Sequence, residues 1–154
     1  MEDRFRYPLF LLIGSICIAA VGERVPQWLS DENPFLRDFM DHDFLSFMGI
    51  ILTLSLGFVV QIRFIINRLK PLLGQRAVDT VAYELRSTVR FLVGIFGSSF
   101  LIALTKPVFA TTAVLEAWFN GIGIILILFF FLIVYDIVMA LVDLDAPDEN
   151  KGPE

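Results

Sequence analysis

The residues best suited to chemistry in this sequence lie in the stretch DFMDHD, residues 38–43. It places Asp38, Asp41 and Asp43 beside His42, the single histidine of the chain. Carboxylates and an imidazole together can bind a divalent cation or respond to pH near neutrality. One imidazole among closely spaced carboxylates, however, lacks the defined ligand spacing of a metal site. We therefore expect a solvated acidic loop here and no bound metal.

Motifs of common enzymes are absent from the sequence. A single histidine cannot supply both axial ligands of a haem, and HExxH, GxSxG and Walker-loop sequences do not occur. The only cysteine, Cys17, excludes an intrachain disulfide and a zinc site built on cysteines. We predict that the protein is not an enzyme and needs no cofactor.

Ionisable residues near the ends of apolar segments are the next candidates. Asp136, Arg63 and Arg90 should lie at a comparable depth in a membrane. We expect a structural ion pair between Asp136 and one of the arginines; a proton relay or ion pathway is the alternative. On the opposite side, Lys106 and Glu116 bracket a short hairpin and could pair across it, an interaction of little energetic value if exposed.

Small residues recur every four positions along one apolar segment and reappear on the next. Lipid gives no hydrophobic drive for helix association, so close backbone approach at small residues commonly drives helix pairing. We expect this stripe to pack within the chain; an interface between copies and a pore lining are the alternatives. Its members are Gly49, Thr53, Gly57 and Gln61, facing Gly94 and Ser98.

The composition that must position these residues is that of a membrane protein. Hydrophobic residues make up 56% of the 154 residues, charged residues make up 19%, and the mean hydropathy is +0.73. The net charge of -5 and the pI of about 4.8 argue against a direct nucleic-acid ligand, because such proteins present a basic face.

Four apolar segments are candidates for membrane-spanning helices, which need about 20 residues to cross the hydrocarbon. We predict an all-α polytopic membrane protein with a single four-helix domain and an acidic, disordered tail. The first segment also resembles a secretory signal peptide, but Glu2 and Asp3 favour a retained helix. The predicted spans are residues 8–22, 44–66, 91–110 and 117–142, within a domain of residues 1–142 and before a tail of residues 143–154.

Basic residues are unequally distributed over this topology. Nine of the twelve Lys and Arg residues fall on one side, which favours both termini in the cytoplasm and a plasma-membrane location, the inner membrane in a bacterium. The cytoplasmic surface is expected to bind a protein partner or anionic lipid. The basic residues predicted for this role are Arg68, Lys70, Arg76 and Arg86.

Local signals predict three further features. Asn33 followed by Pro34 should start a short interfacial helix in the first outer loop. Helical spacing from Gln75 onward predicts that the third membrane helix begins in the cytoplasm. Thr112 is a candidate N-cap for the fourth helix.

Two classes of function follow from these observations. The first is a non-catalytic membrane subunit, a sensor, anchor or scaffold, that oligomerises and engages a cytoplasmic protein, as in envelope stress or anti-phage defence. The second is a homo-oligomeric ion channel, because four spans do not enclose a wide pathway alone and symmetry supplies the rest. The sequence contains no selectivity-filter chemistry, which favours the first class.

Overall fold

The computed structural model describes residues 6–145, and these residues are almost entirely helical. No strand occurs among them, so the prediction of an all-α protein is confirmed. In chain order the elements are α1 (Arg6–Arg24), the 3-10 turn η2 (Pro26–Trp28), α2 (Pro34–Asp38), the π-helical turn η3 (Phe39–Asp43), α3 (Phe44–Leu73), α4 (Gln75–Phe109) and α5 (Ala113–Asp145).

Three helices are long and apolar enough to cross a membrane: Pro34–Pro71, Gln75–Phe109 and Ala113–Val142. Many of their large apolar side chains are exposed, such as Val60, Phe64 and Leu101. A soluble monomer rarely exposes so continuous an apolar surface, whereas lipid covers it without penalty. The prediction of a membrane protein is confirmed at this level.

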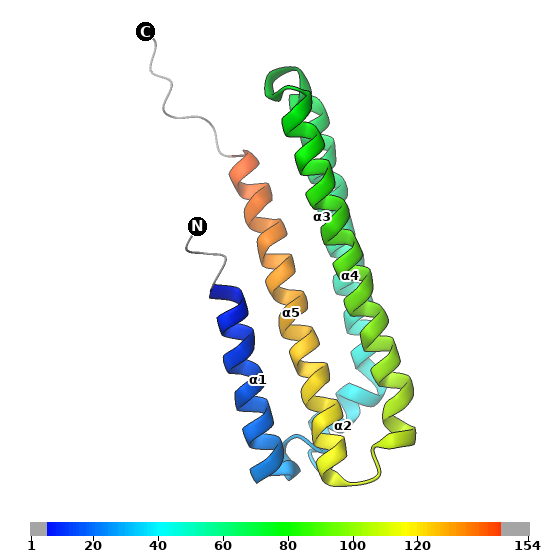
Figure 1. The fold of residues 1–154 in the computed structure, drawn as a ribbon. Coiled ribbons are helices and arrows are strands. Elements are labelled where there is room, and N and C mark those ends of the chain that lie inside the picture. The colour runs from blue at the N-terminus through cyan, green and yellow to red at the C-terminus, as the bar shows by residue number, and fades with distance from the viewer. Residues whose placement is uncertain (1–5, 146–154) are drawn as a thin grey trace.

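The four long helices run alternately in opposite directions (Figure 1). α1 begins and α5 ends at the same end of the bundle as the turn between α3 and α4 (Figure 1). We call this the turn end, and the opposite end, with η2, α2 and the α4–α5 connection, the loop end. α5 is central: it packs against α1 on one side and against α3 and α4 on the other.

The α3–α4 hairpin extends beyond α1 and α5 at the turn end (Figure 1). At 1.5 Å per residue, helices of 30 and 35 residues are roughly 45 and 52 Å long, more than the roughly 30 Å of hydrocarbon. Gly74 makes the tight turn with φ +76°, a conformation that favours glycine. The hairpin is therefore long enough to carry its tip well outside an apolar layer.

Local sequence signals place several helix boundaries correctly. The Asn33 side chain caps α2, accepting a hydrogen bond from the Phe35 amide at 3.1 Å. α4 begins at Gln75 as one continuous helix, as predicted. The Thr112 hydroxyl accepts a hydrogen bond from the Leu115 amide at 3.3 Å at the start of α5. α5 continues to Asp145, three residues into the predicted tail of residues 143–154, and the remainder of that tail lies outside the described residues.

The predicted small-residue stripe does not pack within the chain. Thr53, Gly57 and Gln61 are exposed on α3, as are Gly94 and Ser98 on α4. Only Gly49 approaches a neighbour, with a built Cβ 3.8 Å from Phe96. Four-residue spacing advances about 40° around a helix at each step, so a stripe that starts near a contact winds away from it. The buried face of α3 instead carries mainly large apolar side chains, with one serine: Met48, Ile51, Ser55, Val59, Ile62 and Ile66.

Close helix approach occurs at glycines of α5 that the sequence reading missed. A Cβ built on Gly121 would lie 2.6 Å from Cγ2 of Ile18 on α1. A Cβ on Gly123 would lie 2.8 Å from the terminal methyl of Met40, on the opposite side of the helix. These two glycines allow α5 to sit between α1 and the elements that lead into α3.

Candidate functional site

A partly buried cluster of polar side chains lies at the loop end of the bundle. Lys106 Nζ lies 2.8 Å from Oδ1 of Asp31 and 2.8 Å from Oδ1 of Asp41, and its side chain is only 8% exposed. Asn120 Nδ2 donates to the Leu29 carbonyl at 2.7 Å and to Asp31 Oδ1 at 3.0 Å. We call Asp31, Asp41, Lys106, Glu116 and Asn120 the Lys106 cluster.

The members of the Lys106 cluster come from four segments of the chain. Asp31 lies in the loop after η2, Asp41 in the π-helical turn η3, and Lys106 in the last turn of α4. Glu116 and Asn120 lie one turn apart near the start of α5. The charges suit their helices, because a cation is favoured at a helix C-terminus and a carboxylate near an N-terminus.

The surroundings of Asp31 favour its ionised form. Partial burial alone would raise the pKa of Asp31, but the hydrogen bonds donated by Lys106 and Asn120, with the positive charges of Lys106 and Arg37, outweigh burial and lower the pKa from its usual value. A lowered pKa stabilises the fold above the ordinary pKa of the carboxyl, and this stabilisation is lost as pH falls through the lowered value. Asp31 therefore contributes this stabilisation in full at neutral pH.

The pairing of Lys106 with Glu116 that their positions allow is not the one that forms. Lys106 turns inward to two aspartates, and Glu116 Oε2 instead accepts a hydrogen bond from the Asp31 backbone amide at 3.1 Å. The partners that do form could not be predicted because Asp31 and Asp41 are 75 and 65 residues away from Lys106, a separation that local spacing does not report.

The acidic loop is exposed at Asp38, Asp41, His42 and Asp43, as expected, although Asp41 also belongs to the Lys106 cluster. His42 lines a cleft of about 370 Å³ together with Asp31 and Lys106. Among the described residues, no group of three or more His, Cys, Asp or Glu side chains is arranged to hold a metal ion. The side-chain oxygen Oδ1 of Asn120, a member of the Lys106 cluster, is buried and has no hydrogen-bond partner among the described residues.

The charges and hydrogen bonds of the Lys106 cluster suit a structural role. An ammonium group held between two carboxylates is a poor nucleophile and a poor base. Its geometry ties the loop after η2 and the π-helical turn η3 to the ends of α4 and α5. Together with the hydrogen bond from Asn120 to Leu29, this fixes the loop end in one arrangement.

The predicted charge network at the other end is not assembled within the chain. Arg63, Arg90 and Asp136 are all exposed, and no ion pair joins Asp136 to either arginine in the described part of the chain. Arg63 and Arg90 line one cleft, between α3 and α4, whereas Asp136 lines another, between α3, α4 and α5. Similar depth along the bundle therefore did not bring opposite charges onto one face.

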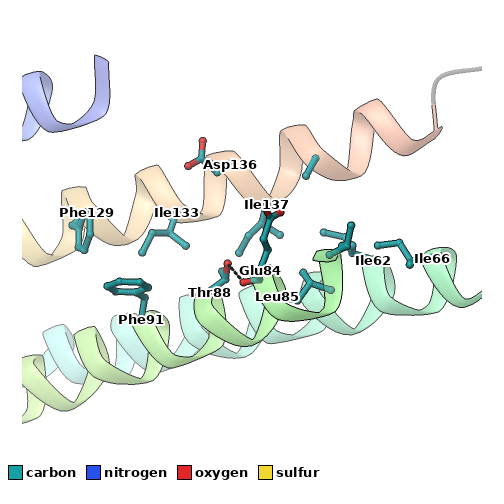
Figure 2. A pocket seen from close by; sticks show the side chains of 12 residues that line it. Ile62, Ile66, Glu84, Leu85, Thr88, Phe91, Phe129, Ile133, Asp136 and Ile137 are labelled. Atoms are coloured by element: carbon teal, nitrogen blue, oxygen red, sulfur yellow. Dashed lines mark hydrogen bonds between the residues drawn. The ribbon is translucent and has the colours of Figure 1, made fainter. Parts of the chain in front are cut away.

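The cleft between α3, α4 and α5 has a volume of about 520 Å³ and is mainly apolar. We call it the turn-end groove. Figure 2 shows Ile133 and Ile137 of α5 facing the α3–α4 hairpin, with Glu84 reaching toward Ile137 and the Asp136 carboxylate pointing away from the hairpin. The side chain of Thr88 donates a hydrogen bond to the Glu84 carbonyl at 3.1 Å. Two exposed carboxylates thus flank an apolar groove that contains no basic residue.

The residues predicted to bind a partner or lipid lie along the α3–α4 hairpin. Arg68, Lys70, Arg76 and Arg86 are exposed, and Arg86 joins Arg63 and Arg90 in the cleft on the hairpin's other face. The sequence reading missed the grooves because their walls come from three helices. Comparison with protein-family models, curated proteins and solved structures finds no match to this chain.

Proposed function

We propose that this chain is a non-catalytic multi-pass subunit of the plasma membrane that binds a cytoplasmic protein in its turn-end groove. In this proposal four helices cross the membrane, α1 included, and the turn end faces the cytoplasm, as the nine-to-three distribution of basic residues favours. The observation that carries the proposal is the apolar groove between α5 and the α3–α4 hairpin, flanked by Glu84 of α4 and Asp136 of α5. The hairpin is long enough to leave the membrane.

The chemistry of the groove selects the kind of partner. Apolar side chains from three helices suit the apolar face of an added helix, which is a common mode of peptide recognition. The exposed carboxylates of Glu84 and Asp136 favour lysine or arginine beside that face. We therefore propose an amphipathic, basic helix of a partner protein as the occupant, with this chain as its membrane anchor or sensor.

The packing within one chain gives no support to conduction by a monomer. In the middle of the bundle the buried polar side chains are Ser55 and Ser99, and each hydroxyl donates to a carbonyl of its own helix. The remaining buried polar side chains of the described residues are at the loop end: Ser30, Lys106 and Asn120. An ion pathway through a single copy would need further polar side chains between the middle of the bundle and the loop end.

Photo-crosslinking from the groove in cells tests the proposed function. A crosslinker at Ala140, which lines the groove, should give a discrete product with a protein whose contacting segment is a basic amphipathic helix. Replacing both rim carboxylates, Glu84→Gln with Asp136→Asn, should reduce that product severalfold, because each removes an attraction to the basic helix.

Two controls make the result specific. A crosslinker at Leu54, exposed on the apolar surface of α3, should not give this product. Glu23→Gln with Glu32→Gln removes two exposed carboxylates elsewhere and should leave it unchanged. A product that forms equally in the rim variant would contradict a groove that selects by charge.

A homo-oligomeric channel remains the second candidate, favoured by the outward-facing stripe. Thr53, Gly57 and Gln61 face away from the chain's own helices, and Gln61 presents an exposed amide on a membrane helix. Such groups are suited to contact another copy or to line a shared pathway. Ion flux through the purified protein in liposomes would favour the channel over the subunit.

A further inference from the structure

A second cleft, on the other face of the α3–α4 hairpin, carries the opposite charge from the turn-end groove. It has a volume of about 620 Å³ and contains no residue of α5. We call it the basic cleft. Its apolar residues come from both helices of the hairpin, and three arginines join them. The lining is Val59, Arg63, Ala82, Tyr83, Leu85, Arg86, Val89 and Arg90.

The three arginines of the basic cleft are free to bind a ligand. None of Arg63, Arg86 and Arg90 forms an ion pair with the side chains described at residues 11–71 and 74–142, and all three are exposed. Arg90 makes a long, weak hydrogen bond, in which its Nε donates to the Arg86 carbonyl oxygen at 3.4 Å. No carboxylate lines the cleft. Several guanidinium groups without a carboxylate suit a phosphate, which accepts paired hydrogen bonds from arginine.

The arginines lie where the apolar surface of the hairpin ends. No charged residue occurs on α3 from Phe44 to Ile62, before Arg63, or on α4 between Arg90 and Lys106. Nineteen uncharged residues on α3 correspond to roughly 28 Å of helix, close to the thickness of the hydrocarbon. Arg63 and Arg90 therefore fall at the level of lipid headgroups, directly beside apolar side chains.

We propose that the basic cleft binds an anionic phospholipid. The arginines hold the headgroup phosphate, and an acyl chain lies against the apolar floor formed by Val59, Leu85 and Val89. A soluble phosphate compound would use the arginines but not the floor. The same end of the protein then offers a lipid site on one face of the hairpin and, on the other, the groove proposed for a protein.

Native mass spectrometry of the purified full chain in detergent tests this proposal. After addition of equal amounts of phosphatidylglycerol and phosphatidylcholine, the protein should retain phosphatidylglycerol preferentially. The triple variant Arg63→Gln, Arg86→Gln, Arg90→Gln should bind it roughly a hundredfold more weakly, from the contribution of three basic residues near a membrane surface. Glycerol phosphate, which lacks acyl chains, should not displace the lipid at equal concentration.

The control removes positive charge from the loop end. Arg24→Gln with Arg37→Gln changes two exposed basic residues that do not line the cleft, and it should keep the preference for phosphatidylglycerol. Equal loss in the cleft variant and the control, or equal retention of the two lipids, would overturn the proposal. Dissociation of an oligomer by the cleft variant in lipid-free detergent would also overturn it, because the cleft would then bind a second copy.

Discussion

At the residue scale, Lys106 is a charged side chain that is buried while apolar side chains near it in the sequence are exposed. Its neighbours Val108 and Phe109 are exposed, while the lysine is 6% exposed and held between two aspartates. In a membrane helix this arrangement places apolar side chains toward lipid and the charge toward protein. A buried ion pair need not stabilise a fold more than apolar packing would, but it specifies one arrangement by penalising every other.

Replacing Lys106 should therefore loosen the loop end. In Lys106→Met the carboxylates of Asp31 and Asp41 face each other without their cation, and we expect a loss of about 3 kcal/mol in the free energy of unfolding, near the low end for breaking a buried pair because Asp41 is partly exposed. The measurement is the unfolding midpoint in detergent at neutral pH.

Two further variants test whether the loss comes from the missing charge of Lys106. Lys70→Met removes an exposed lysine and should change stability by no more than about 0.5 kcal/mol. Adding Asp41→Asn to Lys106→Met should restore part of the loss, because it removes one of the two stranded charges. A Lys106→Met protein as stable as the parent would show that the cluster does not hold the loop end together.

At the element scale, α5 accommodates helices on two sides by using glycine at two different contacts. Gly121 meets Ile18 through a methyl group fixed near its backbone, whereas Gly123 meets the flexible end of Met40. The first contact cannot adjust without moving α1, and the second can adjust by a rotation of the methionine side chain. Gly121 therefore sets how closely α1 approaches α5.

Gly121→Ala should weaken the packing of α1 on α5. The added methyl group would lie 2.6 Å from Ile18 Cγ2, and overpacking of this kind typically costs about 1–3 kcal/mol, more than the roughly 1 kcal/mol that alanine gains in a helix. Unfolding in detergent should show the loss. Ile18→Ala in the same chain should relieve it, since the clashing methyl group is removed.

Gly57→Ala is the matched control, because nothing lies within 4 Å of the position where its Cβ would be. It should leave the stability of the monomer unchanged or slightly increased. If Gly121→Ala were as well tolerated as Gly57→Ala, the spacing of α1 and α5 would not depend on this contact.

The sequence predicted elements well and their contacts poorly. Length and hydropathy are local properties, so the apolar segments, the start of α4 at Gln75 and the caps at Asn33 and Thr112 could all be found. Which face of a helix meets a neighbour depends on crossing geometry, and a stripe such as Gly49 to Gln61 has the same spacing whether it faces protein or lipid. The partners of Lys106 likewise required the fold.

At the scale of the whole molecule, the two ends of the bundle differ in the arrangement of their charged side chains. The loop end holds Lys106 between Asp31 and Asp41, whereas the turn end leaves Arg63, Arg90 and Asp136 exposed on different faces without partners among one another. Paired charges suit a structural role, and unpaired charges beside clefts suit ligands. This difference is why both proposals of binding concern the turn end, and why the side of the membrane that it faces matters.

The orientation predicted from basic residues can be tested with single cysteines in a Cys17→Ser background. Arg76→Cys at the hairpin tip and Thr111→Cys in the α4–α5 connection lie at opposite ends of the bundle and are both exposed. An impermeant thiol reagent added outside intact cells should label Thr111→Cys and leave Arg76→Cys unlabelled until the cells are opened, because the positively charged side remains in the cytoplasm.

An amino-terminal epitope tag then decides whether α1 crosses the membrane. α1 is 19 residues long and packs along α5, close to the length of about 20 residues that a crossing requires. With four crossings the tag should be protected from protease outside intact cells, on the same side as Arg76. A tag accessible together with Thr111 would mean that three helices cross while α1 does not, and a reversed pattern at both cysteines would place the turn-end groove and the basic cleft outside the cytoplasm.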